Sequence, residues 1–271
     1  MRKTFYIVVC AVLLLPGALM TTSCKSQFEA LLESADVEAK YKAAFELFEK
    51  ERYSKASQMF ESVSLATNGT AQDDTVQFYI GYCNYRFGDY PTAESNLEHF
   101  ISVFPLSPFA EQAKFLHLDC LYRGTYRYEL DQIPTRKAIL AMQGFLIDNP
   151  GSEYVPEINK MLDDLNGRLE LKAYKSAYLY YHMEDYLASH YALKNVLKEN
   201  ADNRYREEIL FYIAMSSYKY ASLSIQSKQR ERYLVFVDDY LNMVSEYPDS
   251  HFTKELVPFY EKTQKILKKT E

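Results

Sequence analysis

The sequence has little glycine and proline. Its eight Gly and nine Pro in 271 residues are about half the usual share of these residue types. So few turn-forming residues argue against a β-sandwich or a β-barrel, which need many tight turns. They also leave no material for a glycine-rich nucleotide-binding loop. The 25 Tyr and 16 Phe among 48% hydrophobic residues instead favour a folded, mostly helical protein.

Basic charge and catalytic motifs are also scarce. The 31 Lys and Arg against 37 Asp and Glu give a formal charge of −6, which argues against binding nucleic acid on a basic surface. The five His show no metal-ligand spacing, and the sequence contains no Cys-x-x-Cys, Gly-x-Ser-x-Gly or phosphate-binding loop. We therefore expect a protein without enzymatic activity, cofactor or metal.

The first 24 residues have the pattern of an export signal. Arg2 and Lys3 precede an apolar run over 5–15, which is too short to span a membrane comfortably. Small residues then lead to Cys24, an order that resembles bacterial lipoprotein signals, although Thr21 stands where Leu is preferred. The resemblance implies a signal peptide over 1–23, lipid attachment at Cys24 and a linker over 24–36. An ordinary secretory signal, or a membrane anchor, with an incidental Cys is the alternative.

One segment recurs along the rest of the chain. The windows 78–88 and 211–221 match in phase, 115–123 follows the same phase, and 174–181 and 41–48 do so more loosely. Repeat positions are counted from residue 74 in the second copy. Position 8 is then the small residue Gly81, position 17 is Tyr90, position 20 is Ala93, position 24 is Leu97 and position 32 is Pro105. This spacing resembles the tetratricopeptide repeat.

The repeat has a simple physical basis. Small residues at positions 8 and 20 let two helices of a pair approach closely, and Pro at position 32 ends the second helix. One pair cannot bury its own apolar face, so several pairs must stack. Repeat ends near 68, 105, 150, 201 and 248 predict an all-α solenoid of five tetratricopeptide-like helix pairs, with enlarged third and fifth repeats.

Aromatic residues occupy the helix stripe that faces the groove in this repeat type. Positions 5, 9 and 12 lie on one side of a helix, and position 12 is aromatic in all five copies. A basic or titratable residue follows at position 13 in four of the five copies. We therefore predict a groove for an extended apolar peptide, although packing between helices is the competing interpretation for each ring. The predicted groove residues are Tyr41, Phe45, Phe48, Phe78, Tyr82, Tyr85, Arg86, Tyr122 and Arg123.

The order of these features resembles one family. Cys24 and a short linker containing Phe28 precede the repeats, which end in Pro-x-Ser turns over 104–107, 149–152 and 247–250. This arrangement is similar to the BamD family of outer-membrane assembly lipoproteins. The resemblance implies a lipid-anchored protein at the outer membrane, facing the periplasm. It implies that repeats over 37–150 receive C-terminal signals of unfolded outer-membrane proteins, and that repeats over 151–271 hold the periplasmic domains of a BamA-like barrel insertase.

Five cations in the fourth and fifth repeats are candidates for the insertase contact, and a solvated charged surface is the alternative. These are Arg204, Arg206, Lys228, Arg230 and Arg232. Two other functions stay open. The chain could be a tetratricopeptide lipoprotein of a secretion or pilus system. It could also be a surface glycan-binding lipoprotein, but the absence of Trp argues against that function.

Two smaller features remain. Cys83 and Cys120 occupy the same repeat position in adjacent copies, which allows either a disulfide in an oxidising compartment or two buried thiols. Thr75, within Asp74-Thr75-Val76, resembles a bacterial O-glycosylation triplet.

Overall fold

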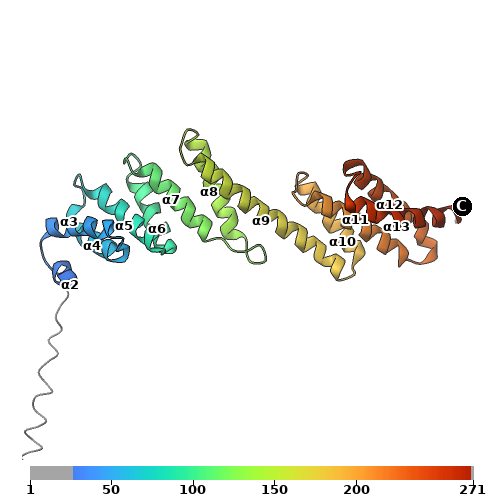
Figure 1. Cartoon of the computed structure of the whole chain (residues 1–271), viewed down its shortest axis with the longest axis horizontal. Helices are drawn as coiled ribbons and strands as arrows, with labels where there is room; N and C mark the ends of the chain where they lie inside the picture. The colour runs from blue at the N-terminus through green and yellow to red at the C-terminus, as the bar shows by residue number, and fades with distance from the viewer. Residues whose placement is uncertain (1–26, 270–271) are drawn as a thin grey trace, which may run out of the picture. The chain divides into compact units, whose positions relative to one another are not determined.

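The structure is a computed structural model that describes residues 27–269. The predicted signal peptide over 1–23 and the predicted lipid site at Cys24 lie outside these residues. All the regular structure within them is helical (Figure 1), which confirms the all-α prediction. The helices are α2 (Gln27–Leu32), α3 (Val37–Glu49), α4 (Tyr53–Thr67), α5 (Asp73–Phe87), α6 (Tyr90–Val103), α7 (Ala110–Arg123), α8 (Ile133–Asp148), α9 (Val155–His182), α10 (Tyr186–Glu199), α11 (Arg206–Ser222), α12 (Gln226–Glu246) and α13 (His251–Lys269).

The chain forms two compact units, one ending at Cys120 and one beginning at Leu121. In the first unit α3 packs on α4, α4 on α5 and α5 on α6. In the second unit contacts run in the same sequential order from α8 to α13. This order, in which each helix mainly contacts its neighbours in sequence, is typical of a helical repeat array. The predicted functional division into 37–150 and 151–271 concerns partners and stays a prediction.

The turns inside the helix pairs lie where the repeat spacing predicts them. The second helix begins at Tyr53, Tyr90 and Tyr186 in the first, second and fourth copies. Two residues before each Tyr the backbone is left-handed, with φ of 57° at Glu51, 92° at Gly88 and 60° at Glu184. Only Gly adopts this conformation without strain, so two of these three turns carry a strained Glu.

Small residues bring the paired helices together, as predicted. Ala44, Ala56 and Ala93 are fully buried. A Cβ atom added to Gly81 would lie only 3.0 Å from the Leu97 side chain, which is closer than normal packing allows. Large side chains from both helices then fill the remaining space in each unit.

Two helices lie outside the predicted five pairs, α2 in the predicted linker and α13 at the other end, and α9 is longer than the repeat predicts. Helix α9 has 28 residues and begins at Val155, well before the fourth repeat window at 174–181. Its first half buries Ile158, Met161, Leu162 and Leu165, an apolar stripe with helical spacing that lengthens the helix. Helix α13 follows the fifth pair and packs against α11 and α12.

Candidate functional site

The predicted groove residues of α3 and α5 form one continuous group of rings in the first unit. Ring centroids of Phe45 and Phe48 lie 4.8 Å and 5.1 Å from that of Tyr79, mostly edge to face. Tyr41 extends the group from Phe45 at 5.1 Å, and Tyr82 extends it from Phe48 at 5.3 Å. All five side chains are half-buried, so the rings both pack on one another and present an aromatic surface.

Arg86 lies on this aromatic surface. Its guanidinium carbon is 4.7 Å from the ring centroid of Tyr53 and 5.8 Å from that of Tyr82, within cation–π range of both. Arg86 also donates a 3.3 Å hydrogen bond to the Tyr82 hydroxyl, and this bond contributes most to raising the pKa of Arg86. Its carboxylate partner, Glu51, is 3.9 Å away and 75% exposed, so the ion pair is weak.

Tyr85 continues the ring series and ties α5 to α7. Its ring stacks with that of Tyr82 at 6.5 Å and lies 5.8 Å from that of Tyr90. Its hydroxyl donates a 2.7 Å hydrogen bond to the Asp119 carboxylate, which is only 8% exposed. The half-buried Tyr85 therefore has a structural role as well as an accessible face.

The structure corrects the groove prediction at Phe78. This side chain is 1% exposed and stacks on Phe109 at 4.6 Å, with an interplanar angle of 9°. Phe78 is therefore a core residue and cannot contact a peptide. Its position on α5 matches that of other groove residues, but Phe109, from the segment before α7, covers it.

Two residues at this surface were not among the predicted groove residues. Tyr79 lies at the centre of the rings, within 5.4 Å of Phe60 as well as the α3 rings. Tyr53 was recognised only as a turn residue, yet it supports Arg86. The signal available in the sequence was the run of adjacent aromatics in α5, which places rings on more than one stripe.

Tyr122 and Arg123 belong to the second unit. Tyr122 donates a 2.9 Å hydrogen bond to Asp164, and Arg168 lies over its ring at 5.4 Å and pairs with the same carboxylate at 2.5 Å. Arg123 is exposed. Of the predicted groove residues, the structure thus brings together Tyr41, Phe45, Phe48, Tyr82, Tyr85 and Arg86 in the first unit.

Two of the predicted docking cations have partners within the chain. Arg204 pairs with Glu170 at 2.8 Å and Asp163 at 3.2 Å on α9. Arg206 contacts Glu246 at 2.6 Å through two of its nitrogens. This corrects the expectation that all five cations face a partner, because these two arginines join segments more than 30 residues apart in this unit.

The other three cations lie on α12. Lys228 has only an exposed pair with Glu231 at 3.4 Å, and Arg230 is exposed. Arg232 has no carboxylate partner among residues 27–269. Its guanidinium carbon lies 4.1 Å from the Tyr220 ring centroid and it donates a hydrogen bond to the Ser224 hydroxyl.

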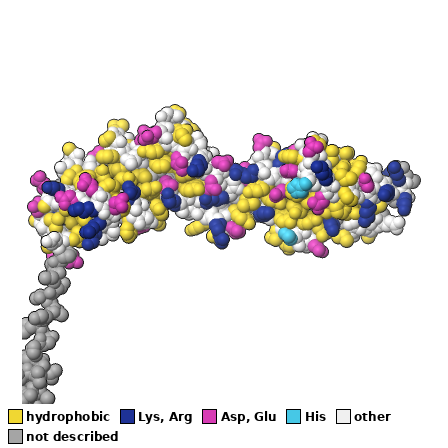
Figure 2. All heavy atoms as spheres, in the orientation of Figure 1, with side chains coloured by type: hydrophobic (Ala, Val, Ile, Leu, Met, Phe, Trp, Pro, Cys, Tyr) yellow, Lys and Arg dark blue, Asp and Glu magenta, His cyan; other side chains and the backbone are white. Residues whose placement is uncertain are grey.

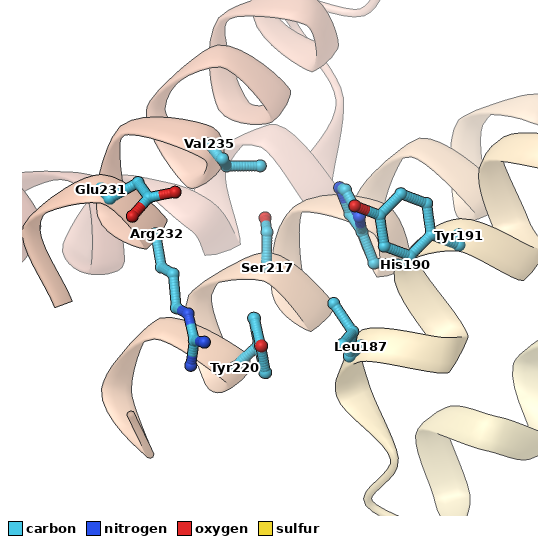
Figure 3. A pocket seen from close by; sticks show the side chains of 8 residues that line it. All are labelled: Leu187, His190, Tyr191, Ser217, Tyr220, Glu231, Arg232 and Val235. Carbon is cyan, nitrogen blue, oxygen red and sulfur yellow. The ribbon is translucent and has the colours of Figure 1, made fainter. Parts of the chain in front are cut away.

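Arg232 lines a pocket of about 290 Å³ between α10, α11 and α12 (Figure 3). The apolar side chains Leu187, Tyr191 and Val235 are 38%, 61% and 39% exposed. An unpaired cation beside exposed apolar side chains can accommodate a carboxylate next to a hydrophobic group. The complete lining is Leu187, His190, Tyr191, Ser217, Tyr220, Glu231, Arg232 and Val235.

A buried polar network lies next to this pocket. Asp239 is 6% exposed, and its two carboxylate oxygens lie 2.9 Å from His190 Nε2 and 2.8 Å from Lys194 Nζ. Burial opposes its ionisation, but the hydrogen bonds from His190, Lys194 and Ser217 outweigh that effect, so the pKa of Asp239 lies below its ordinary value. The network joins α10, α11 and α12 around the pocket.

The remaining candidates contribute no catalytic geometry. Cys83 and Cys120 are buried and are not joined by a disulfide, and burial raises the pKa of the Cys83 thiol to about 12. Thr75 is half-buried inside α5 and donates to Asp74. Between residues 27 and 269 no cluster of His, Cys, Asp or Glu could hold a metal ion. No helix in this range is both long and apolar enough to cross a membrane.

Two comparisons with known proteins match this chain. The profile of the family described as "YfiO: Outer membrane lipoprotein" matches residues 33–234, about three quarters of the chain. The outer membrane protein assembly factor BamD of Caulobacter vibrioides is 22% identical over 197 residues, which cover 73% of this chain and 64% of that protein. The chain thus spans less than two thirds of the relative's length. Both matches confirm the resemblance and the outer-membrane location expected from the sequence, and the chain belongs to the YfiO family of outer membrane lipoproteins.

Proposed function

We propose that this chain is a non-enzymatic scaffold lipoprotein for the assembly of outer-membrane β-barrel proteins. In this proposal its lipid is attached at Cys24, its first unit binds C-terminal signals of unfolded outer-membrane proteins, and its second unit binds a BamA-like barrel insertase. Membership of an outer membrane lipoprotein family supports this role, as does the similarity to a protein named as an assembly factor.

The proposal that the first unit binds C-terminal signals rests on the position of Arg86 on an aromatic surface. A chain that ends in an aromatic residue presents a ring and a free carboxylate together. The ring can pack against the half-buried Phe48 and Tyr82, while the carboxylate binds the Arg86 guanidinium. Glu51 is no obstacle, because a mostly exposed partner at 3.9 Å is readily displaced by water or ligand.

The proposal that the second unit binds the insertase rests on the pocket at Arg232. A partner segment with an acidic side chain next to an apolar one would bind Arg232 while covering Leu187 and Val235. Arg206 provides a natural contrast, because its guanidinium is already bound to Glu246. We therefore assign insertase docking to Arg232 and a structural role to Arg206.

The signal-binding half is tested with two peptides that differ only at the end. One ends in Phe with a free carboxylate, and the other carries a C-terminal amide. The wild-type chain should bind the acid more tightly by about tenfold or more, as expected for a hydrogen bond to a charged group. Arg86→Gln should abolish this preference and leave amide binding unchanged, whereas Arg52→Gln should preserve it.

Equal binding of both peptides by the wild-type chain would contradict the role of Arg86. Retained peptide binding in a folded Tyr82→Ala, Tyr85→Ala double variant would contradict the groove itself. Circular dichroism checks the fold of each variant.

The docking half is tested by recovery of partners from detergent-solubilised outer membranes. The wild-type chain should recover the barrel insertase, and Arg232→Gln should recover much less of it. Arg206→Gln should lower thermal stability and retain the insertase. Recovery of secretion or pilus components without the insertase would overturn the proposed role.

A further inference from the structure

The last two turns of α13 carry a dense group of lysines. Residues 262–269 contain four lysines and no acidic residue: Lys262, Lys265, Lys268 and Lys269. All four are exposed, and Figure 2 shows basic side chains gathered around this end of the helix. The whole chain has a formal charge of −6, so this helix end is opposite in sign to the protein as a whole.

The lysines share the solvent side of α13. The opposite side buries Thr253, Leu256, Thr263 and Leu267 against α11 and α12. Spacings of three and four residues place Lys265 next to Lys262, Lys268 and Lys269 on the helix surface. The four charges therefore project from one face, away from the core.

Glu261, one turn before Lys265, is an acidic neighbour of this group on α13, but it makes no ion pair with these lysines. None of the four lysines has a carboxylate within ion-pair distance among residues 27–269. Like charges three and four residues apart destabilise a helix. The helix dipole favours Lys268 and Lys269 in the last turn, but this effect fades within one turn and does not account for Lys262 and Lys265.

The chemistry of the group favours an extended anionic surface over a single carboxylate. Lysine ammonium groups are mobile point charges on flexible stems, and they bind phosphates without a fixed geometry. Four such charges on one helix face match the polybasic clusters that associate with anionic lipid headgroups. A member of an outer membrane lipoprotein family works beside such a surface. The apolar face of α13 is already buried, so the attraction must be electrostatic.

We propose, beyond the assembly role, that the lysine face of α13 is a peripheral binding surface for anionic phospholipid headgroups. It provides a second contact with the membrane, independent of the lipid at Cys24. The contact adds no insertion into the bilayer, and it weakens as salt screens the charges.

The test uses vesicles and the full mature chain carrying Cys24→Ser, so that an acyl chain cannot contribute. Co-sedimentation is measured with vesicles of phosphatidylglycerol and phosphatidylethanolamine, and with neutral vesicles. We expect binding to the anionic vesicles only, with strong loss between about 0.05 M and about 0.5 M salt. Replacing all four lysines by Gln should lower the partition coefficient about a hundredfold or more, since each lysine near such a surface contributes about fivefold.

Two control variants make the result specific. Replacing all four lysines by Arg keeps the charge and should keep the binding. Changing Lys42, Lys50, Lys160 and Lys198 to Gln alters the net charge equally. These exposed lysines are scattered over α3 and its C-terminal cap, α9 and α10, so binding should persist. Three results would each overturn the proposal. The wild-type chain could bind neutral vesicles as well as anionic ones, or the variant with Gln at all four α13 lysines could bind fully. The variant with Gln at Lys42, Lys50, Lys160 and Lys198 could also lose as much binding as the α13 variant.

Discussion

Asp239 should be one of the most sensitive polar positions of the second unit. Asp239→Asn keeps the side-chain volume but removes the charge that His190 and Lys194 bind at 2.9 Å and 2.8 Å. The His190 side chain is only 8% exposed, so its weakened hydrogen bond should cost about 1.5–3 kcal/mol. Lys194 is 46% exposed and can turn to water, so its contribution should be below about 1 kcal/mol. We expect a total loss of about 2–3 kcal/mol at pH 7.

The assay is urea unfolding followed by far-ultraviolet circular dichroism. Asp238→Asn is the matched control, because Asp238 is the exposed neighbour and its change should stay within about 0.5 kcal/mol. The pKa of Asp239 is lowered from 3.8 in the folded chain. Its stabilisation is therefore complete above that pH and is lost as the pH falls through the lower folded pKa. The difference between wild type and Asp239→Asn should be present above about pH 4 and shrink below it.

Two results would refute this reasoning. One is an Asp239→Asn variant as stable as the wild type at pH 7, which would mean that the buried network contributes nothing. The other is a stability difference that grows as the pH falls below 4, which would mean that the folded state raises the pKa of this carboxyl group.

Three further predictions concern the first unit and the repeat turns. Glu184→Gly should raise the free energy of unfolding by about 0.5–1 kcal/mol, because Gly relieves the left-handed strain; Gly88→Ala, at the equivalent turn, should lower it, and thermal melts of both variants check the pair. Cys83 should resist alkylation by iodoacetamide at pH 8 in the folded chain, because burial raises the pKa of its thiol to about 12, and it should react in urea. Mass spectrometry measures the alkylated fraction in both states, and rapid labelling of the native protein would contradict this prediction. Tyr85→Phe should destabilise the first unit by about 1–2 kcal/mol through loss of the bond to Asp119 but leave peptide binding within twofold, as measured by fluorescence anisotropy.

Local spacing was sufficient to predict most of the fold. The positions of Tyr53, Tyr90 and Tyr186 predicted where second helices begin, and small residues such as Gly81 predicted close helix approach. These features depend on turns and contacts within about 20 residues, for which the sequence pattern is direct. The early start of α9 was missed because residues 155–173 follow helical periodicity without the repeat's small and aromatic markers.

The candidate site was only partly predictable. Positions 5, 9 and 12 correctly indicated which side of α5 carries rings, and Tyr82, Tyr85 and Arg86 lie together. Spacing along one helix cannot show which neighbouring segment covers a side chain, and for that reason Phe78 was assigned to the groove although Phe109 buries it.

The sequence by itself determined that this protein is a helical repeat array with an aromatic stripe, because repeat spacing, small residues and prolines act over short distances. Only the tertiary structure decided which rings are exposed and which cations are available. Arg206 meets Glu246, 40 residues away, and Arg204 meets Asp163, 41 residues away, whereas Arg232 has no such partner among the described residues. Charge and aromaticity belong to the residue, but availability depends on what the neighbouring helix places opposite it.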